Sequence, residues 1–351
     1  MNAAALATRV LPVLADGLDY RLLNEFQRDF PLVPAPFAEL AAQLACTEAE
    51  VLSRLDRLQA SGSVSRVGAV FAPRRVGAST LAALAVPADR LEAVAARVSA
   101  QPEVNHNYER EHAWNLWFVA TAEDGPALVR CLRRIRRETG CPLIALPLET
   151  EYHIDLGFDL RFDGPERAAK ARPPAAPRPI PPGAAPALAD DERRLMTAVQ
   201  DGLALVPRPF SRLAAQAGIS EAAALGILAQ WADTGILKRF GVVVRHHELG
   251  YGANAMCVWA VPETKLDELG MRLAAEPGVS LCYRRRAARD WPYNLYCMVH
   301  GRHRRDVETR VAELARDCGL AGHPAEVLFS GRRFKQRGAY YGAGRNVVAH
   351  G

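Results

Sequence analysis

Hydrophobic residues recur with a helical period over the first part of the chain. They stand three or four positions apart in three successive segments, which predicts amphipathic helices at 20–29, 37–44 and 48–59. Thr47 and Glu50 form a capping box before the third helix, and Gly62 is suited to end it. Residues 63–71 then have the pattern of a short β wing. Three helices and a wing predict a winged helix-turn-helix.

The period changes after this wing, because strand-like and helix-like segments now alternate. Strands are expected at about 80–86, 103–110, 113–121 and 142–149, and helices at 88–100 and 124–139. The order β-α-β-β-α-β is that of a ferredoxin-like split βαβ unit, and the wing's last strand could extend its sheet.

The whole pattern occurs twice. PLVPAPFAELAAQ at 31–43 matches ALVPRPFSRLAAQ at 204–216, a shift of 173 residues, and SRVGAVF at 65–71 matches KRFGVVV at the same shift. VNHNYERE at 104–111 meets VSLCYRRR at 279–286 after small insertions. This alignment sets His106 opposite Leu281 and His153 opposite Ser330. The two halves therefore share a scaffold and differ in chemistry.

A proline-rich stretch separates the two copies. Seven prolines lie between Pro173 and Pro186, which is typical of a semi-rigid, extended linker. The predicted fold class is α+β, a tandem repeat of winged helix-turn-helix and ferredoxin-like βαββαβ domains. We expect the segments 1–72 (first winged helix), 73–163 (first α/β domain), 164–189 (linker), 190–245 (second winged helix) and 246–351 (second α/β domain).

Composition narrows the class of protein without fixing its function. Hydrophobic residues make up 49% of the chain and charged residues 24%, as in ordinary globular proteins. No apolar run approaches the roughly 18–20 residues that cross a bilayer, and the first residues show no basic leader. The seven cysteines are never spaced as CxxC, which favours reduced thiols over a zinc or disulfide framework. We therefore expect a cytoplasmic protein that does not contact the membrane.

Arginine clusters accompany a modest net charge of +5 and suit either nucleic acid or a small polyanion. A recognition helix needs Arg, Lys, Asn or Gln side chains for base edges. The candidate helix at 220–233 has no Lys or Arg, and in the first copy Arg54 and Arg57 stand among acidic residues. The cluster from Arg130 to Arg137 lies on a predicted helix and is interpreted as a solvated face. The sequence thus predicts no binding to nucleic acid.

The most polar and aromatic strands lie in the two α/β domains. VNHNYEREHAWNLWF occupies 104–118, and strand alternation places His106, Tyr108 and Arg110 on one face with Asn107 on the other. The second copy has VSLCYRRRAARDWPYNLYC in the same place. The last strands continue into LETEYHIDLGFDL and AEVLFSGRRFKQRGAYY. These four stretches hold the highest density of histidine, arginine and aromatic residues that could form a site.

The helix-turn-helix followed by an α/β unit resembles the Lrp/AsnC regulators across each half. The segments HNYER, WNLW, YNLY and YHID, with CYRRR and RRFKQRG, resemble more specifically the siroheme decarboxylases, and the match covers both halves except the linker. The resemblance implies non-oxidative removal of two acetate carboxyl groups from siroheme, giving 12,18-didecarboxysiroheme and CO2 in haem d1 biosynthesis. It implies no added cofactor, because the iron belongs to the substrate.

Under this resemblance, histidine is the natural proton donor and arginine forks suit the eight carboxylates of siroheme. The expected catalytic residues are His106 and His153. The expected substrate-binding residues are Tyr108, Arg110, Trp114, Asn115, Tyr152, His246, His247, Tyr283, Arg284, Arg285, Arg286, Arg289, Arg332, Arg333 and Lys335.

Structural roles compete with several of these assignments. Tyr108 and Tyr283 occupy matched positions and could serve the scaffold, Trp114 could belong to the sheet core, and His246 and His247 could form a surface pair. We expect one productive pocket per chain, centred on the first α/β domain and closed by the second, so that the halves form an internal pseudo-heterodimer. Further subunits or a higher oligomer stay open. The alternatives are a tetrapyrrole-responsive regulator and a non-catalytic partner subunit of a decarboxylase complex.

Overall fold

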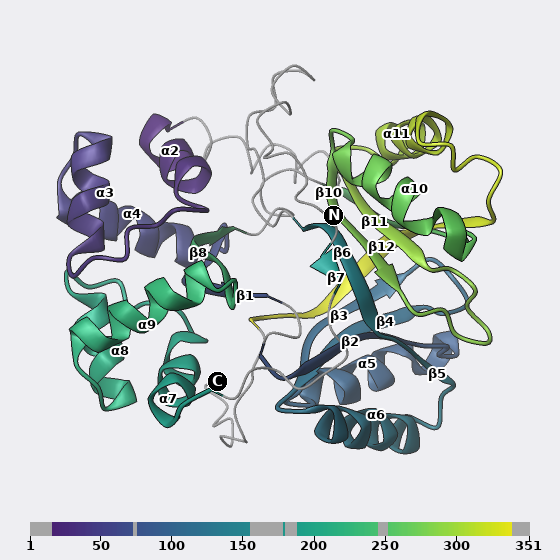
Figure 1. Cartoon of the computed structure of the whole chain (residues 1–351), viewed down its shortest axis with the longest axis horizontal. Coiled ribbons are helices and arrows are strands. Elements are labelled where there is room, and N and C mark those ends of the chain that lie inside the picture. The colour runs from purple at the N-terminus through teal and green to yellow at the C-terminus, as the bar shows by residue number, and fades with distance from the viewer. Residues whose placement is uncertain (1–15, 73–75, 155–177, 180–187, 245–251, 339–351) are drawn as a thin grey trace.

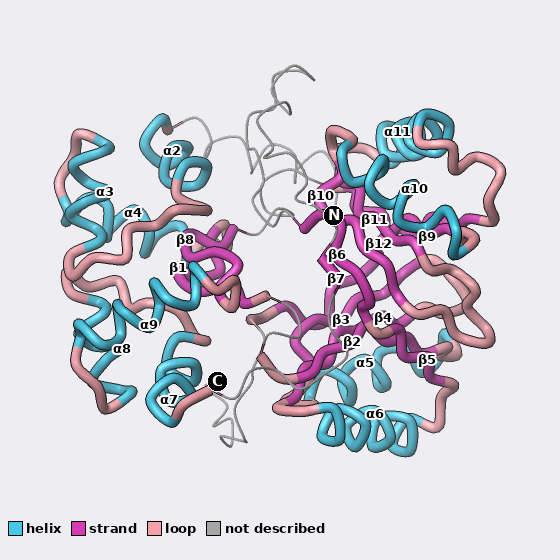
Figure 2. The backbone as a smooth tube through the Cα atoms, in the orientation of Figure 1, coloured by secondary structure: helices cyan, strands magenta, loops and turns pink. Residues whose placement is uncertain are grey.

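The computed structural model describes residues 16–72, 76–154, 178–179, 188–244 and 252–338. Helical heads from both halves gather at one side of the molecule, and the strands of both α/β domains gather at the other (Figure 1). A short two-stranded ribbon lies between them, as the strand colouring in Figure 2 makes plain. Within the described residues, no helix is long and apolar enough to cross a bilayer.

Each head has the three helices and the wing that its sequence predicts. The Thr47 side chain caps α4 by accepting from the Glu50 amide, and Gly62 follows that helix with a φ of 82°. The first head comprises α2 (Gly17–Glu25), α3 (Pro36–Leu44), α4 (Glu48–Ala60) and the wing strand β1 (Val64–Phe71). The second comprises α7 (Asp190–Val199), α8 (Pro209–Ala217), α9 (Glu221–Asp233) and β8 (Leu237–Val244).

The two heads form one unit around a shared hydrophobic core. Strands β1 and β8 pair antiparallel, with Gly68 directly opposite Gly241. At Gly241 a Cβ atom would stand only 2.5 Å from the Phe26 carbonyl oxygen, so this close approach requires glycine. The wings therefore pair with each other and do not extend the large sheet.

Each α/β domain follows the predicted order of strands and helices. In the first, these are β2 (Ala78–Leu84), a 3-10 turn (Ala88–Arg90), α5 (Leu91–Ala100), β3 (Val104–Arg110), β4 (Leu116–Ala122), α6 (Gly125–Thr139), β5 (Leu143–Leu146) and β6 (Leu148–Ile154). In the second, they are β9 (Ala253–Trp259), α10 (Glu263–Ala275), β10 (Val279–Arg285), β11 (Leu295–Gly301), α11 (Arg304–Asp317) and β12 (Ala325–Gln336). The short β7 (Arg178–Pro179) pairs with β6.

The two domains exchange their last strands. Strand β5 pairs with β2 of its own half, but its continuation β6 pairs with β10 of the other half. Strand β12 likewise pairs first with its own β9 and then with β3 of the first half. The strand order is β5-β2-β4-β3-β12-β9-β11-β10-β6-β7. Because each domain is completed by the other, the halves form one interlocked body.

The strand register corrects one detail of the repeat alignment. Gln336 pairs with His106, and Ile154 pairs with Leu281 at the matching place in the other half. His106 and Leu281 are repeat equivalents, so His153 corresponds to Lys335 and not to Ser330. The alignment slipped because local sequence similarity is weak where the strands cross between halves.

Helices cover the outer face of each half-sheet and leave the inner faces to meet each other. Helices α5 and α6 pack over the first half, and α10 and α11 over the second. Between the inner faces lies a third cluster that includes Leu81, Trp117, Met256 and Tyr283. This core also joins the halves, since the rings of Trp117 and Trp291 lie 5.1 Å apart at 63°.

Candidate active site

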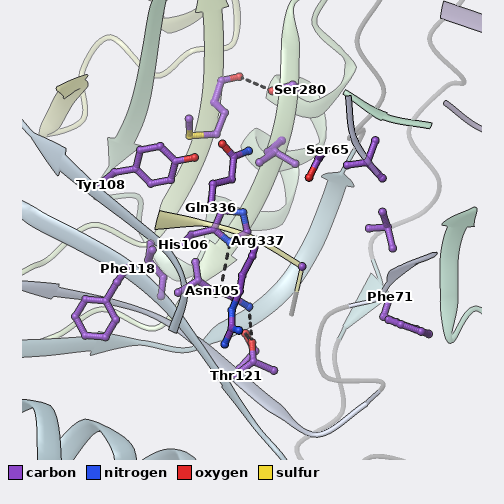
Figure 3. A pocket seen from close by; sticks show the side chains of 18 of the residues that line it. Ser65, Phe71, Asn105, His106, Tyr108, Phe118, Thr121, Ser280, Gln336 and Arg337 are labelled. Atoms are coloured by element: carbon purple, nitrogen blue, oxygen red, sulfur yellow. Dashed lines mark hydrogen bonds between the residues drawn. The ribbon is translucent and has the colours of Figure 1, made fainter. Parts of the chain in front are cut away.

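A cavity of about 440 Å³ lies between the inner sheet faces and the β1–β8 ribbon. Both halves and the heads contribute to it. Its labelled residues in Figure 3 come from the wing strand (Ser65, Phe71), from β3 and β4 (Asn105, His106, Tyr108, Phe118, Thr121), from β10 (Ser280) and from the end of β12 (Gln336, Arg337). Such a volume falls in the range of small-molecule sites.

His106 stands on β3 with its side chain at this cavity. Its Nδ1 lies 3.3 Å from the Oδ1 of Asn105, whose own amide donates to the Thr121 hydroxyl at 3.1 Å. Burial, helped by the positive charge of Arg66, lowers the pKa of His106 to about 4. The ring is therefore neutral at pH 7 in the protein alone.

The predicted alternation along β3 is confirmed. His106, Tyr108 and Arg110 line the cavity, whereas the Asn107 side chain donates to the Ala95 carbonyl under α5. Burial raises the pKa of Tyr108, which keeps its hydroxyl protonated. The β3 strand thus presents a histidine, a phenol and a guanidinium in a row.

Arg110 and Arg285 occupy matched positions on the two sheets. Arg110 Nη1 donates to the Leu328 carbonyl at 2.9 Å, and Arg285 Nη1 donates to the equivalent Leu146 carbonyl at 2.8 Å. The Arg285 guanidinium also lies 4.6 Å above the Tyr283 ring. Burial lowers the pKa of Arg110 to about 10, so its charged form is held at a cost.

Several buried polar atoms at the cavity have no hydrogen-bond partner among the described residues. They are the Nε atoms of Arg66, Arg110 and Arg285 and the Oδ1 atom of Asn254. Buried donors are normally satisfied, and an orphaned one commonly marks a place for an absent ligand. The cavity therefore has the chemistry of an anion site.

Several arginines away from the cavity are paired with carboxylates. Arg284 contacts Glu149 at 2.9 Å and Glu263 at 2.7 Å, and Arg134 contacts Glu103 at 2.7 Å. By contrast, Arg110 and Arg285 have no carboxylate within ion-pair distance in the described part of the chain. The charges of Arg110 and Arg285 are therefore not balanced by the carboxylates of the described residues.

Some cavity residues escaped prediction from sequence. Arg66, Arg239 and Arg337 line it, as does His300, whose Nε2 lies 2.9 Å from the Ser280 hydroxyl. Arg66 and Arg239 are repeat equivalents within SRVGAVF and KRFGVVV, and that match was the available signal. The match was interpreted as a shared scaffold, because the sequence around these arginines does not show that the wing strands face a cavity.

Other predicted site residues lie outside the cavity. Tyr152 is buried beneath α10 and donates to Asp267, and the Asn115 amide braces the backbone of Val86, as Asn294 does for Val261. Half-buried Trp114 is also outside the cavity lining, and its backbone carbonyl accepts from the Trp117 indole. His153 is half-buried on β6, in register with Cys282, and does not line the cavity.

The remaining predicted cations also point elsewhere. Arg284 and Arg286 share Glu149, and exposed Arg332 contacts Glu92 and Glu109. Lys335 donates to the carbonyls of Ser99 and Gln101, and burial lowers its pKa to about 8. Arg289 and Arg333 are exposed. His246 and His247 lie outside the described residues.

The two arginines of helix α4 make ion pairs within the first head. Arg54 contacts both Asp16 and Asp19 at 2.9 Å, and Arg57 contacts the same buried Asp19. These contacts tie α4 to α2. No cluster of His, Cys, Asp and Glu within the described residues could hold a metal ion.

Comparisons with known proteins agree with this arrangement. A family model described as the AsnC-like ligand binding domain matches residues 75–153 and 248–335. A second, described as the siroheme decarboxylase NirDL-like HTH domain, matches residues 19–64 and 192–237. Both models match once in each half, as the repeat requires.

Full-length relatives carry the same two halves. The chain is 47% identical to the siroheme decarboxylase NirDL subunit of Paracoccus denitrificans, over 92% of this chain and 97% of the relative. It is 32% identical to the siroheme decarboxylase of Hydrogenobacter thermophilus, over 90% and 92%. A crystal structure of the siroheme decarboxylase NirDL with an iron-uroporphyrin III analogue superimposes with a TM-score of 0.66 at 29% identity, covering 92% and 94%.

Proposed function

The chain belongs to the siroheme decarboxylase family, and on that basis we propose that its cavity binds siroheme and removes two acetate carboxyl groups as CO2. The product is 12,18-didecarboxysiroheme, an intermediate toward haem d1. The observation that carries this proposal is the set of cavity arginines whose buried Nε donors are unsatisfied among the described residues, Arg66, Arg110 and Arg285.

Binding follows from charge and shape. Siroheme is a flat macrocycle with eight peripheral carboxylates, and an arginine side chain can donate two parallel hydrogen bonds to one carboxylate. Arg110 and Arg285 approach from the two half-sheets, and Tyr108 and Tyr283 line the cavity beside them. Half of the site comes from each half of the chain, so the fused halves act as a built-in heterodimer.

The bond changes need no oxidant or reductant. The bond between an acetate methylene carbon and its carboxyl carbon breaks, CO2 departs, and the electron pair moves into the macrocycle. A proton then reaches the methylene carbon and completes a methyl group. The substrate supplies the electron sink, and the protein supplies anion binding, a dry environment and a proton.

His106 is the proposed proton donor because it is the predicted catalytic histidine that lines the cavity. Its pKa is low in the empty site, since burial and Arg66 both disfavour the imidazolium. Carboxylates brought in by the substrate oppose the effect of Arg66 and raise that pKa. Substrate binding thus favours the protonated form of the proposed donor. His153 is not carried into this proposal, because it stands outside the cavity.

The reaction is proposed to take place in the cytoplasm. All seven cysteines are free, and burial raises the pKa of the Cys131, Cys282 and Cys297 thiols, which keeps these thiols protonated and less reactive. Reduced thiols are typical of that compartment.

The test is anaerobic incubation of the purified chain alone with siroheme, followed by mass measurement of the tetrapyrrole. We expect a product lighter by two CO2. An unchanged mass with siroheme bound would favour the partner-subunit or sensor alternatives. A gel shift with genomic DNA separates these two, since only a regulator retards DNA.

A further inference from the structure

The paired wings bring two matched arginines to the cavity from the side of the heads. Arg66 and Arg239 each stand two residues before the central glycines Gly68 and Gly241. They are therefore related by the same pseudo-twofold relation that matches Arg110 to Arg285. Four of the cavity arginines form two such pairs, one on the sheets and one on the ribbon.

The Arg66 side chain is held in place by close packing. Its Nη2 donates to the Ala69 carbonyl at 3.0 Å. A Cβ atom at Gly338 would stand 3.1 Å from Nη2, and one at Gly202 would stand 3.1 Å from Cδ. Gly202 has a φ of 91°, so its backbone independently requires glycine. Glycine on both sides leaves room for this arginine and fixes its direction.

Arg239 is also held by a hydrogen bond to a backbone carbonyl. Its Nη1 donates to the Gln27 carbonyl at 2.7 Å, next to the place where Gly241 lets β8 approach α2. A hydrogen bond to a backbone carbonyl fixes part of each wing arginine, and both side chains line the cavity.

A buried guanidinium held in this way is costly without an anion. Arg66 retains an unsatisfied Nε, and burial lowers its pKa although the negative charge of Asp201 opposes that shift. If stability alone mattered, an apolar residue of similar size would stabilise this part of the protein more than the arginine does. The wing arginines are thus better explained by a ligand than by stability.

We infer that Arg66 and Arg239 bind carboxylates of the tetrapyrrole from the ribbon side, opposite Arg110 and Arg285. The winged-helix ribbon is then a carboxylate-binding face of the active site. This inference rests on the proposed function, because it assigns the ligand of the same cavity. It also gives the heads a role that needs no DNA.

The test uses the full chain and iron-uroporphyrin III, which carries eight carboxylates. Arg66→Gln and Arg239→Gln each raise the Kd by about tenfold or more, the usual effect of losing a charge-assisted hydrogen bond. Each also lowers the dependence of log Kd on log salt concentration. Arg66→Lys and Arg239→Lys keep the charge but lose the fork, so they fall between wild type and Gln. With siroheme, KM rises for both Gln variants.

Arg130→Gln is the matched control, because it removes the same charge from an exposed position on α6. It leaves the Kd unchanged. Folded Gln variants, checked by thermal unfolding, that bind iron-uroporphyrin III as tightly as wild type would overturn the inference and leave the proposed function intact. A wild-type chain that does not bind this ligand would overturn both.

Discussion

Gln336 at the end of β12 pairs in register with His106 on β3. These residues belong to different halves of the chain, 230 positions apart in sequence, and both line the cavity. The strand that carries Gln336 begins on its own half-sheet at β9 and crosses to β3. The proposed proton donor is therefore placed by one half and flanked by the other.

The low pKa of His106 makes stability depend on pH. The folded value is about 4, against about 6.5 in an unfolded chain. Between these values the unfolded state binds a proton that the folded state does not, so stability falls as pH drops from 6.5 toward 4 and is unaffected above 6.5. Urea unfolding should show His106→Gln gaining up to about 3 kcal/mol on wild type over this range. A difference between the two proteins that stays constant with pH would contradict this account.

We expect Arg110 to lower the stability of the ligand-free protein and to strengthen ligand binding. Its buried charge has no carboxylate partner within the described residues, so Arg110→Met should raise the free energy of unfolding by about 1 kcal/mol without ligand. The same variant should weaken iron-uroporphyrin III binding at least tenfold. Chemical unfolding and absorbance titration measure the two effects. A variant that binds like wild type would show that Arg110 is structural.

The exchanged strand β6 is fixed by a contact that tolerates no extra atom. A Cβ at Gly270 would lie 2.4 Å from Tyr152 Cε2, and the Tyr152 hydroxyl is held by Asp267 at 2.5 Å. Gly270→Ala should therefore destabilise the protein by about 1–3 kcal/mol. Gly226→Ala, at an exposed position of helix α9 with open space around it, should stabilise by about 0.5–1 kcal/mol. Thermal unfolding that moves both variants the same way would be inconsistent with this packing.

Protonation by an exchangeable group predicts the isotopic content of the product. In D2O the His106 ring carries deuterium, so each new methyl group should gain one deuterium atom, two in all. Mass spectrometry of the product detects them. Methyl groups without deuterium would mean that the hydrogen came from a non-exchanging source, and the proton-donor role would fail.

Local periodicity sufficed to predict the elements and the doubled fold, because each helix and strand buries one face. It also placed His106 and Arg110 on the correct face of β3. The exchange of β6 and β12 was not predicted, because the alternation of polar and apolar residues along a strand does not show which strand it pairs with. The same limit explains why Tyr152 and Lys335 were predicted to bind substrate. Both belong to motifs that resemble those of the family, but their side chains pack against helices. Arg66 and His300 were missed for the converse reason, since only the assembled halves bring wings and sheets around one cavity.

The most direct test is the rate at which His106→Gln converts siroheme, compared with wild type, under anaerobic single-turnover conditions with detection by mass. The account predicts that wild type yields a product lighter by two CO2, whereas the variant still binds siroheme within a few-fold of wild type and converts it at least about a hundredfold more slowly. Conversion by the variant at the wild-type rate would contradict the assignment of His106 and the proposed chemistry of the cavity.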